Sequence, residues 1–129
     1  MHYAPVFLLG CSLFALETSS AAAECLKDNV EGQSAAGQLT VMRAQDAAGR
    51  PERPYILRLP VTACLDADDP DDAVKSTRTI HVFPAESKLQ PSFHKLIGKM
   101  VVVRGSPFAQ HTAHHHAPIV MQVTEINRR

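Results

Sequence analysis

Five short segments, each rich in apolar and β-branched residues and each bounded by turn residues, constrain the fold of this chain most strongly. Strands with one apolar face must pack that face against a common core, so this pattern indicates an all-β domain. The sequence contains no internal repeat and no long linker. The five predicted strands are residues 37–44, 55–64, 74–83, 99–105 and 119–126.

The segment between residues 84 and 98 departs from this β pattern. It contains Pro91 and Phe93, and Gly98 follows as a stop signal, so we predict one short helix there. Three strands, a short helix and two strands is the element order of the OB-fold, a Greek-key barrel. We therefore predict a mostly β fold, a small five-stranded OB-like barrel with one short helix between strands 3 and 4. A β-sandwich or an SH3-like barrel accounts for the strands but less well for the helix.

Alternation along the strands predicts which side chains face the core. Pro60 interrupts the second strand and indicates an edge or a bulge there. The unbroken apolar run Met100–Val103 predicts a strand buried on both faces. Residues expected on a single core-facing side are Tyr55, Leu57, Leu59 and Val61 in the second strand and Ile119, Met121 and Val123 in the fifth.

The N-terminal segment is apolar and ends in the small residues Ala21-Ala22-Ala23, which is the pattern of a secretory signal peptide. We predict a signal peptide over residues 1–23, cleavage before Glu24, and a single exported domain over residues 24–129. The apolar stretch is too short to remain as a membrane-spanning helix in the mature chain. No Lys or Arg precedes it, and lipoprotein processing at Cys11 remains an alternative.

Two cysteines, Cys25 and Cys64, remain after this cleavage. In an oxidising compartment an even pair of this kind predicts a disulfide. Closing a loop of about 39 residues would stabilise the fold by roughly 4 kcal/mol in the chain-entropy model. Two buried free thiols, or thiolates that join the histidines as metal ligands, are the alternatives.

The charge balance argues against nucleic acid as a partner. The chain has 13 Lys and Arg and 13 Asp and Glu, and the loss of Glu17 with the signal peptide leaves a net charge near +1. Such a chain lacks the positive charge that attracts nucleic acid or an anionic membrane. Single-strand binders also need aromatic rings along a basic groove, and this chain contains no Trp.

Three segments carry a resemblance to a family. A Tyr-Ile-Leu-x-Leu-Pro strand leads to a Cys at residues 55–64, Leu-x-Gly-Lys-x-Val-x-Val-x-Gly covers residues 96–105, and Phe-x-x-x-Thr-x-His-His-His-x-Pro-Ile covers residues 108–119. The chain resembles an uncharacterised family of small exported bacterial proteins, classed as a domain of unknown function. Pro107 and Ala113 depart from its pattern. The resemblance implies bacterial export, hence a periplasmic location, and a compact β domain, but no activity.

The histidine-rich segment is the strongest candidate for a functional site. Neutral imidazole is a common ligand for zinc, copper and nickel. Pro118 favours extended backbone just before it, and in extended backbone His114 and His116 share one face while His115 lies on the other. No carboxylate lies within the segment to orient a ligand. A structural role in ordering the loop and a pH switch remain alternatives to a metal site formed by His111, His114, His115 and His116.

Other chemistry is less well supported. The acidic loop of residues 66–72 contains five aspartates but lacks the Gly and the late Glu of an EF-hand loop, which favours a solvated turn over a calcium site. The sequence contains no G-x-S-x-G, H-E-x-x-H or glycine-rich phosphate motif. We therefore expect a non-enzymatic exported barrel that binds zinc, copper or nickel, another small ligand or a protein. A structural or partner-binding domain, and a zinc-dependent hydrolase, are the alternatives.

Overall fold

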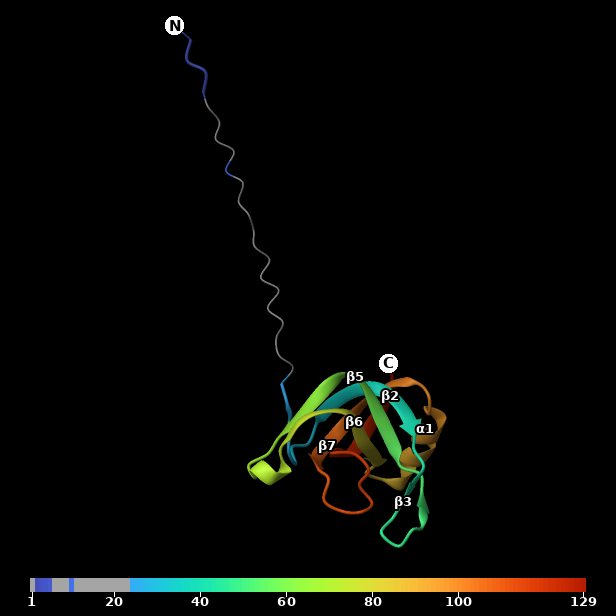
Figure 1. The fold of residues 1–129 in the computed structure, drawn as a ribbon. Helices are drawn as coiled ribbons and strands as arrows, with labels where there is room; N and C mark the ends of the chain where they lie inside the picture. The colour runs from blue at the N-terminus through green and yellow to red at the C-terminus, as the bar shows by residue number, and fades with distance from the viewer. Residues whose placement is uncertain (1, 6–9, 11–23) are drawn as a thin grey trace.

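The computed structural model of the protein contains five strands that close into a barrel, shown in Figure 1. Around the barrel the order is β5-β2-β7-β8-β6, and β6 pairs again with β5, which closes the sheet. The β6–β8 pair is parallel, whereas the other four pairs are antiparallel. The predicted five-stranded OB-like barrel is therefore confirmed. The barrel strands are β2 (Gln33–Val41), β5 (Tyr55–Asp66), β6 (Val74–Pro84), β7 (Met100–Ala109) and β8 (Ile119–Arg128).

The short helix lies where the sequence predicts it, between the third and fourth strands of the barrel. A 3-10 turn, η2 (Ser87–Leu89), leads into α1 (Gln90–Lys95). Gly98, at a φ of 83°, adopts the left-handed conformation that favours glycine just after the helix. Phe93 of α1 is fully buried, and its ring centroid lies 5.1 Å from that of Tyr55 on β5. The helix thus contributes an aromatic side chain to the barrel core.

The core consists of alternate side chains from the five barrel strands together with Phe93. Ile119, Met121 and Val123 of β8 are fully buried in it, as alternation predicts. The buried residues of this core are Leu39, Leu57, Leu59, Leu65, Ile80, Val82, Phe93, Val101, Val103, Ile119, Met121, Val123 and Ile126.

Two predictions about burial are wrong. Val61 does not face the core but is 67% exposed. The pairing of β5 with β6 shifts register between residues 58 and 63, around Pro60, which interrupts the regular alternation of inward and outward side chains. Met100–Val103 is not buried on both faces either, since Met100 is 41% exposed while Val101 and Val103 are fully buried. The outer face of a barrel strand is turned to solvent unless a loop covers it.

Two glycines allow the strands to approach closely. A Cβ on Gly37 of β2 would lie 2.3 Å from the carbonyl oxygen of Arg58. A Cβ on Gly105 of β7 would lie 2.0 Å from the carbonyl oxygen of Gln122, next to a register shift between β7 and β8. Both contacts are with backbone, so a larger residue would force neighbouring strands apart.

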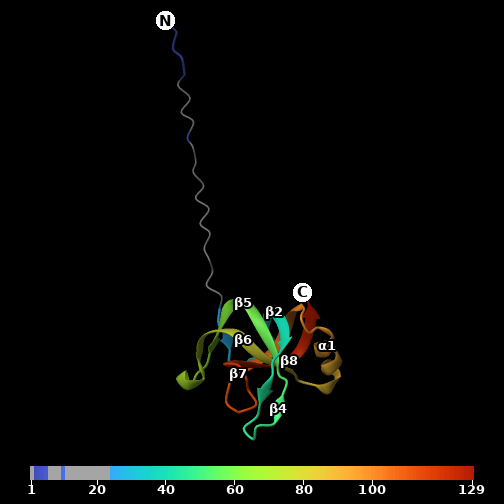
Figure 2. The same ribbon diagram turned by 45° about the vertical axis from the view of Figure 1, so that its right-hand side comes forward.

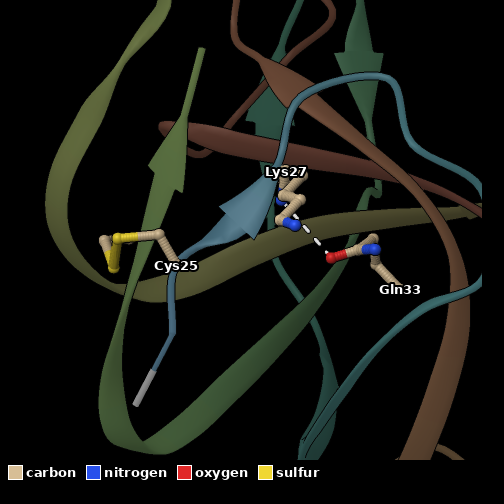
Figure 3. Close-up of a disulfide and its surroundings, with 4 residues drawn as sticks. Cys25, Lys27 and Gln33 are labelled. Carbon is tan, nitrogen blue, oxygen red and sulfur yellow. Dashed lines mark hydrogen bonds between the residues drawn. A yellow bond between two sulfur atoms is a disulfide. The ribbon is translucent and has the colours of Figure 1, made fainter. Parts of the chain in front are cut away.

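The predicted disulfide between Cys25 and Cys64 is present, with a sequence separation of 39 residues (Figure 3). Cys25 immediately precedes β1 (Leu26–Lys27), which pairs in parallel with the end of β5. The backbone N–H of Lys27 donates a hydrogen bond to Oε1 of Gln33, at 3.4 Å. These contacts attach the start of the domain to the barrel.

Two connections project from the same end of the barrel. One is the hairpin of β3 (Ala44–Gln45) and β4 (Pro51–Glu52), which joins β2 to β5. The other is the histidine loop, residues 110–118, which joins β7 to β8. Figures 1 and 2 show them side by side, away from the C-terminus. These are the L12 and L45 connections that border the ligand-binding face in OB-folds.

The structure describes residues 2–5, 10 and 24–129. The predicted signal peptide, apart from residues 2–5 and 10, and the alternative processing site at Cys11 lie outside the described residues. The acidic loop contains a 3-10 turn, η1 (Pro70–Asp72), which Asp69 caps by accepting a hydrogen bond from the N–H of Asp71 at 2.9 Å. Among the described residues, no helix has the length and apolar character needed to cross a membrane.

Candidate functional site

The histidine loop is ordered by hydrogen bonds within itself. The N–H of Gln110 donates to the carbonyl of Pro118 at 3.0 Å, which closes the loop at its base. Nδ1 of His115 accepts from the N–H groups of His111 and Thr112, at 3.1 and 3.3 Å. Because Nδ1 is the acceptor, a neutral His115 carries its proton on Nε2. His115 therefore stabilises the turn.

The β3–β4 hairpin has its own ordered turn. Oδ1 of Asp46 accepts from the N–H groups of Ala48 and Arg50, each at 2.9 Å, and Oδ2 accepts from Nε of Arg50 at 2.8 Å. Hydrogen bonds from Arg50 and Ala48 hold the pKa of Asp46 below its usual value. Gly49, at a φ of 78°, supplies the left-handed residue of the turn. The turn positions Glu52 at the end of β4.

Glu52 connects the hairpin to the histidine loop. Its Oε1 is hydrogen-bonded to Nδ1 of His114, and its Oε2 to Nε2 of His116 at 2.6 Å. The side chains of Glu52 and His116 are mostly buried, whereas that of His114 is exposed. Hydrogen bonds from His116, and then from His114, lower the pKa of Glu52, so its carboxylate is charged at neutral pH. Two imidazoles and one carboxylate thus meet between the two connections.

His81 lies beneath this group, on the outer face of β6. It is opposite Ile56 on β5 and Val120 on β8, and all three side chains are buried. Nδ1 of His81 accepts a hydrogen bond from the N–H of His116 at 3.2 Å. Burial, and then the neighbouring His116 and His115, lower the pKa of His81 to about 4. His81 is therefore a neutral acceptor that fixes the backbone of the histidine loop.

The loop covers a second apolar cluster outside the barrel core. Val120 is fully buried although it faces outward, and it lies opposite Phe108 of β7. The ring centroid of Phe108 is 5.3 Å from that of His115 and 5.4 Å from that of His111. His111 also places its Nδ1 3.1 Å from the carbonyl oxygen of Ala109. These two imidazoles therefore pack against Phe108 of the barrel.

The four histidines of the predicted metal site therefore separate into two sets. His114 and His116 both contact Glu52, while His111 and His115 pack against Phe108. The backbone at His114 is a turn, closed by the hydrogen bond from the N–H of His115 to the carbonyl of Thr112, and not the extended conformation that the sequence predicts. In the described part of the chain, the potential ligand atoms that all lie within 4.8 Å of one another belong to Asp46, Glu52 and His114. Metal binding by the four histidines stays a prediction.

Sequence reasoning missed Glu52, Asp46 and His81. Glu52 precedes His114 by 62 residues and His81 precedes His116 by 35, so no local spacing connects them. The one signal that leads to Glu52 is topological, because an OB-fold brings its first and last long connections to the same end of the barrel.

Residues 79–127 match the family model described as Domain of unknown function (DUF4431), which confirms the expected resemblance to a domain of unknown function over that part of the chain. The matched residues run from β6 almost to the end of β8 and contain the histidine loop, whereas Glu52 and the hairpin lie outside them. No curated protein matches the chain.

Proposed function

We propose that this protein is a non-enzymatic, exported barrel that binds a divalent transition metal between the β3–β4 hairpin and the histidine loop. Asp46, Glu52 and His114, whose potential ligand atoms lie within 4.8 Å of one another, are the proposed ligands, and His116 holds the other carboxylate oxygen of Glu52. The observation that supports this proposal is the single carboxylate held between two imidazoles that come from a different connection.

The donor set suits the metals predicted from the histidines. Imidazole nitrogen and carboxylate oxygen together are ligands for zinc, and imidazole also suits copper and nickel. Three protein ligands leave a position for water or a further ligand. A metal ion bound by Glu52 and His114 would take the place of the hydrogen bond between them, and metal ligands must be deprotonated, so binding should weaken in acid.

Calorimetric titration of the barrel domain, residues 24–129, with zinc, copper and nickel tests this proposal directly. We expect saturable binding that Glu52→Gln weakens by about 10- to 100-fold and that His114→Ala with His116→Ala abolishes. His94→Ala on α1 is the matched control, because His94 is an exposed histidine on another element. Absence of saturable binding, or binding that survives the double substitution, would contradict a metal site here.

A structural role for the same contacts is the second candidate. It is supported by the acceptor nitrogens of His115 and His81, which bind backbone N–H groups of the histidine loop. In that case the Glu52 contacts only fasten the loop to the hairpin. The double substitution then lowers the melting temperature of metal-free protein, and zinc does not raise the melting temperature of the wild type. If the site binds metal, zinc should raise the melting temperature of the wild type but not that of the double variant.

A zinc-dependent hydrolase is the least supported alternative. A hollow of about 320 Å³ lies beside the group and is lined by residues that include His81, His114 and Glu52. Metal-assisted hydrolysis also needs an acid or base beside the bound water. Glu52 contacts both imidazoles and is proposed here as a ligand, which leaves it unsuited to that second role.

A further inference from the structure

One nitrogen of the His81 ring has no hydrogen-bond partner and opens into a hollow beside the proposed metal site. The residue is only 8% exposed, and its Nδ1 accepts a hydrogen bond from the N–H of His116. Within the described part of the chain, no hydrogen bond joins Nε2 of His81 to another group, yet no fully buried side-chain nitrogen or oxygen lacks a partner there. Nε2 is therefore accessible, and it opens into the hollow of about 320 Å³ that His81 lines.

The contact with the histidine loop makes this nitrogen a hydrogen-bond donor. Because Nδ1 of His81 accepts a hydrogen bond, the proton of the neutral ring lies on Nε2. A ring nitrogen that carries a proton cannot bind a metal ion. Transfer of the proton to Nδ1 would break the contact with the N–H of His116. His81 therefore offers the hollow a donor and not a further metal ligand.

The same hollow adjoins two of the proposed metal ligands. Its lining includes Glu52, His114 and the exposed Arg53. In the metal-free protein, the charged carboxylate of Glu52 offsets the charge of Arg53 and opposes the entry of an anion. A divalent cation bound by Asp46 and Glu52 would balance both carboxylates. The hollow would then combine a metal ion, a positive guanidinium group and the Nε2–H donor of His81, all of which attract an anion.

We propose that the metal-loaded protein binds a small molecule in this hollow through an oxyanion group, a carboxylate or a phosphate. The proposal rests on the proposed metal site. One oxygen of the oxyanion would occupy the coordination position that the three protein ligands leave open. A second oxygen would accept the hydrogen bond from Nε2 of His81, and Arg53 would add a charge-assisted hydrogen bond. The volume of the hollow is at the lower end of the range for ligand pockets, which indicates a small molecule.

Calorimetric titration of the barrel domain, residues 24–129, tests this proposal in two steps. Zinc is titrated first, and propionate, methyl phosphate and the neutral propionamide are then titrated into the zinc-saturated protein. We expect saturable binding of at least one oxyanion at roughly millimolar concentration and no binding of propionamide. Protein made metal-free with a chelating resin should bind none of the three. Addition of the bound oxyanion should also shift the visible absorption band of the copper-loaded domain, since its oxygen would enter the coordination sphere.

His81→Asn separates the ligand contact from the loop contact. The amide oxygen of Asn can replace Nδ1 as acceptor for the N–H of His116, but no donor remains at the position of Nε2. We expect this variant to bind zinc nearly as the wild type does and the oxyanion about tenfold or more weakly. Arg53→Gln should also weaken oxyanion binding. Arg43→Gln is the matched control, because Arg43 is an exposed arginine of the same hairpin that does not line this hollow.

The order of the titrations separates this inference from the proposed metal site. If zinc does not bind, both are wrong. If zinc binds but neither oxyanion does, or if propionamide binds as well as propionate, only the inference is overturned. It is also overturned if His81→Asn and Arg53→Gln both bind the oxyanions as Arg43→Gln does. Arg53→Gln alters an exposed side chain, so it keeps the test decisive if His81→Asn impairs folding. Comparison of propionate with methyl phosphate assigns the oxyanion to a carboxylate or a phosphate.

Discussion

At the scale of single residues, the histidines of this barrel perform two different tasks. His114 and His116 donate hydrogen bonds to Glu52, which suits nitrogens that can exchange a proton for a metal. His115 and His81 instead accept hydrogen bonds from backbone N–H groups through Nδ1. An imidazole nitrogen accepts a hydrogen bond only when it carries no proton. The histidine loop therefore depends on two side chains that remain neutral.

The lowered pKa of His81 predicts a stability loss in mild acid. The unfolded chain binds a proton at His81 near pH 6.5, whereas the folded protein binds it only near pH 4. Unfolding thus takes up a proton between these values, and the free energy of unfolding of metal-free protein should fall by about 1–3 kcal/mol as the pH drops from 6.5 to 4. The lowered pKa of His115 acts in the same direction.

Urea unfolding at a series of pH values between 7 and 4 measures this loss. His81→Asn is the informative variant, because the amide oxygen can replace Nδ1 as acceptor but does not titrate. Its unfolding free energy should depend less on pH than that of the wild type. If the unfolding free energies of the two proteins change equally with pH, His81 is not the source of the acid sensitivity.

At the scale of elements, the close approach of β7 and β8 depends on a glycine. β7 and β8 pair from residues 101 to 109 with one register shift, and Gly105 lies beside that shift. The backbone of β8 occupies the space that a side chain at Gly105 would need. The register shift and the glycine together permit β7 to continue toward the histidine loop.

Gly105→Ala should therefore destabilise the barrel. The added Cβ would lie 2.0 Å from the carbonyl oxygen of Gln122, and backbone cannot rotate away as a side chain can. We expect the free energy of unfolding to fall by about 1–3 kcal/mol or more. Ser106→Ala, at the next residue of β7, is the matched control and should change it by less than about 0.5 kcal/mol. Similar melting temperatures for the two variants would refute this account of the strand contact.

At the scale of the whole molecule, the disulfide connects the start of the domain to the middle of the chain. Cys25 and Cys64 close a loop that contains β2 and the β3–β4 hairpin. Those two elements supply one wall of the barrel and the Glu52 carboxylate. Constraining them in the unfolded chain lowers the entropy gained on unfolding.

Loss of the disulfide should lower the free energy of unfolding by about 4 kcal/mol in the chain-entropy model. Comparison of the oxidised protein with the double variant Cys25→Ala/Cys64→Ala by urea denaturation measures this difference. Reductant should destabilise the wild type and leave the double variant unchanged. A double variant as stable as the oxidised wild type would show that the loop is equally constrained without the bond.

Much of the fold could be predicted from local pattern, and the failures have identifiable causes. Short β-branched segments between turn residues located all five barrel strands, and Pro91, Phe93 and the stop at Gly98 located the helix. The prediction for Val61 is wrong because alternation assumes a constant pairing register, and the register of β5 against β6 shifts around Pro60. Residues 45–54 are predicted as a simple turn, yet they include most of a hairpin that places Glu52 against the histidine loop.

The amino-acid sequence by itself determined the strands, the short helix, and the pairing of Cys25 with Cys64. The strands and the helix follow from the residues within each segment, and the cysteine pair follows from the even number that the predicted cleavage leaves. Only the tertiary structure decided that Glu52 meets two of the histidines and that His81 fixes the backbone of the histidine loop. Those contacts depend on barrel closure and on hairpin register, which join residues far apart in the chain and leave no periodic trace in it.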